Sequence, residues 1–247
     1  MIIIKNRAQI EIMRKPARIV VKAFEMLERH IKPGITTKEL DKIAADYIKS
    51  RGGLPSFLGY KGFPASINTS VNNVIVHGVP DATVLKNGDI IGIDIGVFYE
   101  GYHGDAARTY GVGKISDADK KLIEVSKQSF FEGIKYAKEK NFLNQICKAI
   151  QEYVVSNGFT IMEDFIGHGI GKTLHEEPDI PNHDIKKRGP RLMKGMTFAI
   201  EPMISPGIND YYIEEDGWTA RTKDGKNSAH YENTIVITDG EPEILTI

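Results

Sequence analysis

The chain has 247 residues, which is long enough to bury a substantial hydrophobic core. Its formal net charge is −1, so the composition gives no indication of a polyanionic or membrane partner. A single cysteine, Cys147, excludes an intramolecular disulfide framework and indicates a reducing cytoplasm. Cys147 lies at helical spacing with Leu143 and Ile150 without a basic neighbour, so we expect an inert core thiol.

Two helices followed by strands are predicted in the first half of the chain. Asn6-Arg-Ala-Gln9 resembles a capping box, and apolar residues recur at helical spacing from Ile10 to Leu27. Pro16 should kink or divide this helix. Thr36-Thr-Lys-Glu39 starts a second helix, which ends at Gly52-Gly53. β-Rich segments follow near residues 65–79, 89–98 and 104–112.

The second half repeats this order of elements. Ser116-Asp-Ala-Asp119 opens a helix that continues to about Glu139. Another helix runs from about Asn144 to Asn157-Gly158. The chain then becomes β-rich again near residues 160–166, 197–204, 210–222 and 230–238.

The repeated order predicts a pseudo-twofold protein of the α/β (α+β) class, with two helices and antiparallel strands in each half. No composition shift or linker marks a domain boundary. We therefore expect a single domain over residues 1–247, with halves of about 1–112 and 113–247, and a site on the axis between them.

Four acidic residues lie in or beside apolar, β-rich segments: Asp94, Asp105, Glu201 and Glu232. Aspartate and glutamate are rarely fully buried unless something pairs with them. Four carboxylates in one core would repel one another, and two divalent ions would neutralise all four. Asp94 also shares a strand face with Gly92 and Gly96, whose small size leaves space for an ion or a substrate.

Sequence spacing indicates that the two aspartates lie on neighbouring strands. Their midpoint falls between Tyr99 and Glu100, just before Gly101. A hairpin turning there would bring the two carboxylates within cross-strand reach.

The same reasoning applies to the two glutamates. Their midpoint falls between Asp216 and Gly217, and Asp-Gly is a strong hairpin signal. The 31-residue separation leaves room for bulges, so this indication is weaker than the first.

Three histidines have suggestive contexts. His168 lies between Gly167 and Gly169, which allow close backbone approach to an imidazole ligand. His77 and His175 follow apolar or glycine-rich segments and could orient or protonate a reacting group; a loop histidine bonded to backbone is the alternative for each.

Oxygen-rich ligation with one imidazole does not select one metal sharply, and Co, Mn, Fe or Zn could serve. The absence of a thiolate argues against a structural zinc site. Paired divalent ions generate hydroxide at neutral pH, so the chemistry that this set indicates is hydrolysis.

In this order and spacing the motifs resemble the bacterial (type I) methionine aminopeptidases of the M24 "pita-bread" metallopeptidase family. The resemblance covers essentially the whole chain. It is carried by His77-Gly-Val-Pro, Ile93-Asp94, Gly104-Asp105, Gly167-His168-Gly-Ile-Gly, His175-Glu-Glu-Pro, Ala199-Ile-Glu201-Pro-Met and Tyr231-Glu232. The chain is too short for the large N-terminal domain of prolidase-like relatives.

The resemblance implies a dinuclear metal centre. Asp94 would bind one ion, His168 and Glu201 the other, and Asp105 and Glu232 would bridge the two. Activated hydroxide would then attack the carbonyl of the first residue.

The resemblance also implies removal of the initiator methionine from nascent proteins whose second residue is small. His77 and His175 would contact the substrate at the scissile bond, and Glu201 would also shuttle the proton. The methionine side chain would occupy a pocket formed by Phe57, Tyr60, Phe63, Leu174 and Trp218; ordinary core or rim packing is the alternative for the aromatic residues.

Several residues depart from the family pattern. Phe57 replaces a frequent cysteine, Phe63 a frequent tyrosine, Asn68 another cysteine, and Asn233 the usual histidine after Glu232. These changes leave an apolar pocket and the metal ligands intact, so activity should survive.

The same resemblance suggests a monovalent cation site formed by Asn72, Val74 and Ser228; ordinary polar loop residues are the alternative.

A non-catalytic binding protein on the same fold and another dinuclear metallo-exopeptidase remain as alternative functions. Retention of all five candidate ligands disfavours the first. We expect a cytoplasmic monomer that acts on nascent chains and contacts the ribosome transiently. Lys186-Lys-Arg188 is a candidate contact, although three basic residues beside Gly189-Pro190 are more often an ordinary solvated loop.

Overall fold

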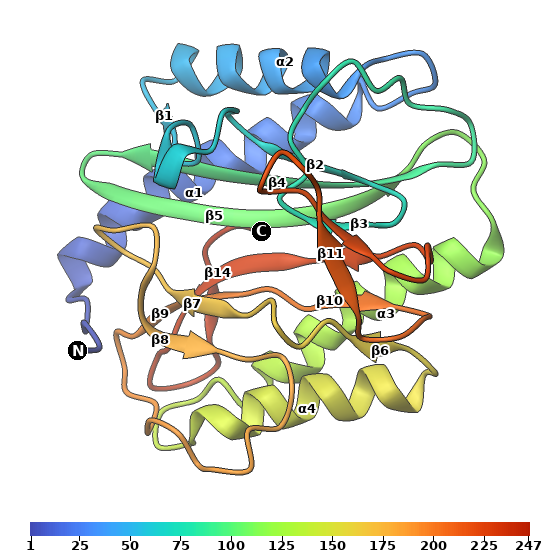
Figure 1. Ribbon diagram of the computed structural model, residues 1–247. Coiled ribbons are helices and arrows are strands. Elements are labelled where there is room, and N and C mark those ends of the chain that lie inside the picture. The colour runs from blue at the N-terminus through green and yellow to red at the C-terminus, as the bar shows by residue number, and fades with distance from the viewer.

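Four α-helices, one 3₁₀ turn and fifteen strands make up the computed structural model, which describes residues 1–247 (Figure 1). The helices are α1 (Arg7–Glu28), α2 (Thr37–Ser50), α3 (Asp117–Ile134) and α4 (Leu143–Ser156), and the 3₁₀ turn is η1 (Tyr60–Gly62). The strands are β1 (Leu54–Pro55), β2 (Asn68–Val71), β3 (Val74–Val76), β4 (Ile90–Tyr99), β5 (Tyr102–Gly111), β6 (Thr160–Ile161), β7 (Gly167–Gly169), β8 (Glu176–Ile180), β9 (Thr197–Ile200), β10 (Met203–Ser205), β11 (Tyr211–Ile213), β12 (Ala220–Thr222), β13 (Ala229–His230), β14 (Glu232–Val236) and β15 (Glu243–Ile244).

The predicted helix starts are confirmed by reciprocal capping. The side chain of Asn6 accepts from the Gln9 backbone N–H at 3.0 Å, and the Gln9 side chain accepts from the Asn6 N–H at 2.9 Å. Thr36 caps α2 in the same way. α2 ends just before Gly52, whose φ of 78° favours glycine.

Two helix predictions need correction. Pro16 does not divide α1, which continues through it. The backbone of α1 packs tightly there against Gly104 of β5, and this contact holds the helix on the sheet despite the lost hydrogen bond. α3 ends at Ile134 and not near Glu139, because the chain turns with Tyr136 N–H bonded to the Gly133 carbonyl.

The strand prediction for residues 160–166 is correct only at its start. β6 covers two residues, and a turn closed by Phe165 N–H to the Met162 carbonyl follows it. The sequence also does not predict β1, β7, β8 or β15, since each is short or rich in glycine and charged residues.

A nine-stranded antiparallel sheet runs through the molecule. Its path is β1-β4-β5-β14-β9-β7-β8, with β2 also paired to β4 and β15 to β14. Two three-stranded sheets, β13-β10-β6 and β11-β12-β3, complete the strands. The β5–β14 pairing joins the first half of the chain to the second, and Figure 1 shows β14 beneath the long β4–β5 hairpin.

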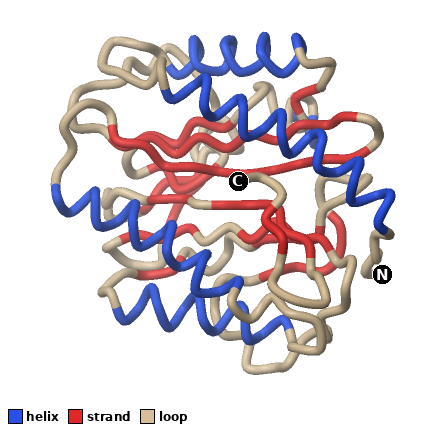
Figure 2. The backbone as a smooth tube through the Cα atoms, turned by 180° about the vertical axis from the view of Figure 1, so that it is seen from behind, coloured by secondary structure: helices blue, strands red, loops and turns tan.

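The helices cover the outside of the sheets in two pairs. α1 and α2 pack over the β4–β5 half, and α3 and α4 pack over the half that contains β6, β10 and β13 (Figure 2). Ile91, Ile93 and Ile95 point toward α1 and α2 in one core, and Cys147 is buried with Phe198 in the other. The predicted α/β class and repeated order of elements are therefore confirmed.

No helix combines the length and the apolar character that crossing a membrane requires.

Candidate metal centre and active site

The β4–β5 hairpin positions the two aspartates. Its register pairs Asp94 with Ala107 and Gly96 with Asp105, so both carboxylates lie on one face of the sheet as diagonal neighbours. A turn at Glu100-Gly101, with φ of 48° and 84°, closes the hairpin. This turn lies one residue later than the midpoint of the aspartates predicts, which makes the pair diagonal and not directly opposite.

Nested antiparallel pairs position the two glutamates. Asn233 pairs with Ile200 in β14–β9, and Met203 pairs with His230 in β10–β13. The two pairings share one register, so Glu201 and Glu232 lie opposite each other between them. The β11–β12 hairpin keeps the same register around Asp216-Gly217. The predicted cross-strand relation of the two glutamates is confirmed, because one register is kept along the whole segment between them.

His168 reaches this cluster from β7. It pairs with Ala199 of β9, and its Nδ1 bonds the Gly169 carbonyl at 2.8 Å, which leaves Nε2 as the free lone-pair donor. Nε2 lies 3.6 Å from Glu201 Oε1. A Cβ at Gly167 would lie 2.3 Å from the Ala199 carbonyl oxygen, so strand pairing at this position requires glycine.

Burial raises the pKa values of the four carboxyl groups. Asp94 is 9% exposed, Asp105 3% and Glu232 2%, so water solvates none of these three charges well. Burial, followed by repulsion from neighbouring carboxylates, raises the pKa values of Asp94, Glu201 and Glu232 well above their usual range. Burial raises the pKa of Asp105 to about 7.

Several donor atoms in this cluster have no partner within the protein. Asp94 Oδ1, Asp105 Oδ1 and Glu232 Oε1 are buried without a hydrogen bond, which is costly unless something else binds them. The ligand atoms of Asp105, His168 and Glu232 lie within 4.8 Å of one another, and so do those of Glu201, His230 and Glu232. Unpaired carboxylate oxygens beside imidazole nitrogens fit divalent metal ions.

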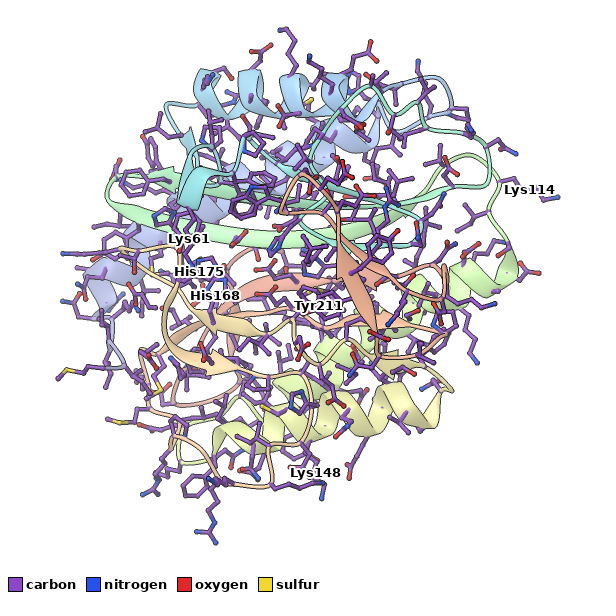
Figure 3. All side chains as sticks on the ribbon, viewed as in Figure 1. Lys61, Lys114, Lys148, His168, His175 and Tyr211 are labelled. Carbon is purple, nitrogen blue, oxygen red and sulfur yellow. The ribbon has the colours of Figure 1, made fainter.

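His175 lies against His168 at the entrance to the cluster. Their ring centroids are 4.0 Å apart, and Figure 3 shows the two side chains together with Lys61 on the same side of the molecule. The Tyr60 hydroxyl bonds His175 Nδ1 at 2.8 Å and orients the ring. The residue is exposed as a whole, but desolvation by the surrounding protein, followed by His168 and Lys61, lowers the pKa of His175 to about 3, so the imidazole is neutral at pH 7.

His77 faces the same cavity from the loop after β3. Its backbone φ is 58°, an unusual value for a residue with a side chain. The ring stays accessible from the cavity. Desolvation by the surrounding protein, and then the charge of Lys61, lower the pKa of His77. The Trp218 ring meets it edge-on, with centroids 6.4 Å apart.

A cavity of about 250 Å³ connects all these groups. The structure brings together every residue that the sequence assigns to catalysis, divalent ions and the methionine pocket, and all of them line this cavity: Phe57, Tyr60, Phe63, His77, Asp94, Asp105, His168, Leu174, His175, Glu201, Trp218 and Glu232. Phe63 and Trp218 meet edge to face at 5.3 Å. The cavity is therefore apolar at one end and acidic at the other.

Two departures from the family pattern have different surroundings. Asn68 lines the cavity, and its Nδ2 donates to Asp94 Oδ2 at 2.6 Å. Asn233 does not line it; its Oδ1 accepts from Arg108 at 2.6 Å and from Thr246 at 3.0 Å. Asn68 is thus part of the acidic end, and Asn233 supports the fold behind it.

The three candidate residues for a monovalent cation lie in one region outside the main cavity. The Asn72 carbonyl accepts from Ser228 N–H at 2.9 Å, and Val74 begins β3 two residues further on. The Asn72 side chain already bonds Asp89 and the Ile90 N–H.

Sequence reasoning missed two features of the site. His230 has no motif of its own, yet its Nε2 lies 3.8 Å from both Glu201 Oε2 and Glu232 Oε2. Lys5 forms a buried ion pair with Glu176, next to His175. The contacts of His230 with Glu201 and of Lys5 with Glu176 join segments that are distant in the chain, so they have no local sequence signal. The alternation in His230-Tyr-Glu232 is local and could have placed His230 and Glu232 on one face of an extended segment. His103, two residues before Asp105 in the chain, has its Nδ1 hydrogen-bonded to the Ser56 hydroxyl at 2.8 Å.

The sequence profile of metallopeptidase family M24 matches residues 11–239, a span that includes the cavity residues. The chain belongs to metallopeptidase family M24 and is a metal-dependent hydrolase.

Its similar relatives are bacterial methionine aminopeptidases. That of Clostridium perfringens is 51% identical over 247 residues, covering 100% of this chain and 99% of the relative. Methionine aminopeptidase 1 of Bacillus subtilis is also 51% identical, over 246 residues, with 100% and 99% coverage. The crystal structure of methionine aminopeptidase from Rickettsia prowazekii has a TM-score of 0.98 at 38% identity, with each chain covered fully. The predicted pita-bread fold and bacterial type are confirmed.

Proposed function

We propose that the protein removes the N-terminal methionine from polypeptides whose second residue is small, using two divalent ions. The observation that carries this proposal is the cluster of four carboxylates and an imidazole that lines a partly apolar cavity, with three of the carboxylates buried and each of these holding an unpaired oxygen. The bacterial relatives named methionine aminopeptidase support the substrate.

The five donors would divide between the two ions. Asp94 would bind one ion, His168 and Glu201 the other, and Asp105 and Glu232 would bridge them. Membership of Glu232 in both groups of closely spaced ligand atoms supports its bridging role. When bound, such ions activate water and polarise the peptide carbonyl.

Side chains around the centre would bind and orient the peptide. Glu201, whose pKa is raised by burial and then by neighbouring carboxylates, would accept the proton and return it to the leaving amine. His77 and His175, both with lowered pKa values, would hold the scissile peptide as neutral imidazoles. The Tyr60 hydroxyl would keep His175 in the required orientation.

The apolar end of the cavity would select methionine. Phe57, Tyr60, Phe63, Leu174 and Trp218 supply an aromatic and aliphatic lining that suits an unbranched thioether side chain. A bulky second residue would have to fit next to His77 and His175, so small residues are favoured there.

The decisive experiment compares Met-Ala-Ser with Met-Leu-Ser, first on metal-stripped protein and then with Mn, Co, Fe or Zn restored. We expect metal-dependent release of methionine from the first peptide only. Cleavage of neither peptide by folded, metal-loaded protein would favour a non-catalytic relative, and cleavage of other N-terminal residues would favour another exopeptidase.

We further propose that residues 1–247 act as a single catalytic domain and as a cytoplasmic monomer that meets its substrates at the ribosome. Lys186, Lys187 and Arg188 form an exposed basic segment for this encounter. Replacing all three with Ser should weaken ribosome co-sedimentation at low salt and leave tripeptide cleavage unchanged. Equal co-sedimentation of the variant and the wild type across a salt series would refute this contact.

A further inference from the structure

His230 occupies a tightly held position behind the acidic cluster. Its backbone N–H donates to Thr109 Oγ1 at 3.0 Å, and its carbonyl accepts from the same hydroxyl at 2.9 Å. The residue also pairs with Met203 across β13 and β10. Only 3% of it is exposed, and Nε2 is buried without a hydrogen-bond partner. A buried nitrogen held this firmly without a partner is costly unless it binds something.

The distances around Nε2 identify what it could bind. Nε2 lies 3.8 Å from Glu201 Oε2 and 3.8 Å from Glu232 Oε2, which is too far for a hydrogen bond to either. Two donors about 2.1 Å from a shared divalent ion are about 3.0 Å apart at a coordination angle of about 90° and about 3.6 Å apart at about 120°. The two separations of 3.8 Å are about 0.2 Å longer than the upper value, so a small side-chain shift would bring Nε2 and either oxygen onto one ion.

The position of His168, the predicted imidazole ligand, can be compared with that of His230. Its Nε2 lies 3.6 Å from Glu201 Oε1, so the two oxygens of Glu201 face one imidazole each. His168 faces the cavity, whereas His230 does not line it. A ligand that approaches from behind the carboxylates would leave the substrate side of the centre open.

We propose that His230 is a sixth protein ligand of the metal centre, with Nε2 binding the ion that Glu201 and Glu232 share. This inference rests on the proposed function. A second neutral imidazole adds a donor without adding charge, and it favours ions such as Co²⁺, Fe²⁺ and Zn²⁺ over Mg²⁺.

The test is the ¹H NMR spectrum of the protein loaded with Co²⁺, with ion stoichiometry measured on the same sample. A ligating imidazole shows a strongly shifted exchangeable ring N–H, so we expect two such signals, from His168 and His230. His230→Gln keeps an N–H donor but lacks the ring, and it should retain one signal. His30→Gln, which changes a histidine outside the cavity, should retain both.

Binding of Co²⁺ gives a second readout that does not depend on activity. His230→Gln and His230→Ala should each lower the affinity for one of the two Co²⁺ ions by about 10- to 100-fold. Two bound ions with a single shifted imidazole signal, together with wild-type affinity in His230→Gln, would show that the residue is only a hydrogen-bond donor and overturn this inference. Two imidazole signals with one bound ion would uphold His230 as a ligand and overturn the dinuclear proposal instead. No Co²⁺ binding at all would overturn both.

Discussion

Asp105 links the two halves of the site at the scale of single residues. It lies on β5, the strand that pairs with β14 and its Glu232. Its backbone N–H donates to Thr234 Oγ1 at 3.0 Å, and the Thr234 hydroxyl donates to the Asp105 carbonyl at 2.8 Å. The backbone of Asp105 is thus fixed to the second half of the chain through the Thr234 side chain, while its carboxylate Oδ1 remains unpaired.

Asp105→Asn should abolish turnover without unfolding the protein. The amide has the shape of the carboxylate but lacks the charge that a bridging ligand supplies, so we expect a loss of at least about 100-fold in kcat/KM. Circular dichroism should be unchanged, and mass spectrometry of bound metal should show fewer ions. Asp239→Asn, at an exposed ion pair with Lys194, is the control and should behave as wild type. A near wild-type rate in metal-replete Asp105→Asn would contradict the dinuclear assignment.

Asn68 should tune the metal centre through Asp94. Its Nδ2 donates to Asp94 Oδ2 at 2.6 Å and keeps the carboxylate oriented. Asn68→Ala should lower the affinity for the ion bound by Asp94 by about 10-fold. A competition titration with a chelating dye would measure this, with Asn227→Ala as a control for loss of a side-chain amide elsewhere. The orienting role fails if Asn68→Ala binds both ions as tightly as wild type.

At the scale of elements, β7 shows how a short strand can depend on glycine. Its three residues pair with β8 on one side and β9 on the other, which carries His168 into the cluster. A Cβ at Gly169 would lie 2.2 Å from the Glu177 carbonyl oxygen, a rigid backbone atom. The pairing of β7 with β8 and the position of the His168 imidazole therefore both depend on glycine at position 169.

Gly169→Ala should lower both stability and activity. Relief of the clash would push β7 from β8, which we expect to cost about 1–3 kcal/mol in the free energy of unfolding and to displace His168. Urea unfolding and peptide cleavage would measure the two effects. Gly240→Ala is the matched control, since the nearest atom to its new Cβ would be 4.0 Å away. Equal unfolding midpoints for the two variants would show that β7 tolerates a side chain.

At the scale of the whole molecule, the metal-free protein should lose stability as pH rises from about 6.5 to about 8. Burial raises the pKa of Asp105 to about 7 and raises those of the other three carboxyl groups well above their usual range. The folded state therefore holds protons that the unfolded chain has already released, and this stabilisation is lost as pH rises through the folded pKa values.

The buried histidines act in a lower pH range. Burial lowers the pKa of His168 to about 4 and that of His230 to about 3, so they reduce stability only when pH falls below about 6.5. Melting temperatures measured in EDTA at about pH 6.5 and 8 therefore report the effect of the carboxyl groups without that of the histidines. Added Co²⁺ should raise the melting temperature more at the higher pH, because it replaces the protons. A metal-free melting temperature that is equal or higher at pH 8 would contradict the burial of unpaired carboxylates.

Much of the architecture was predictable because it depends on local hydrogen bonds and on the period of the sequence. Asn6 and Thr36 cap their helices through residues three positions away. The alternation of isoleucine with Gly92, Asp94 and Gly96 shows which face of β4 is buried against the helices. The end of α3 was misplaced because a local turn, with Tyr136 N–H bonded to the Gly133 carbonyl, stops the helix early, and α1 continues through Pro16 where its backbone packs against Gly104.

The sequence alone determined the α/β repeat, the cross-strand relations of the acids, and the set of candidate side chains that line the cavity. Only the tertiary structure decided that β7 lies beside β9, that Asn68 orients Asp94, and that His230 lies behind the two glutamates. Cross-strand spacing within one hairpin follows from counting residues, because the strand period is two. Contacts between distant segments follow from sheet order and packing, and no local pattern in the sequence encodes them.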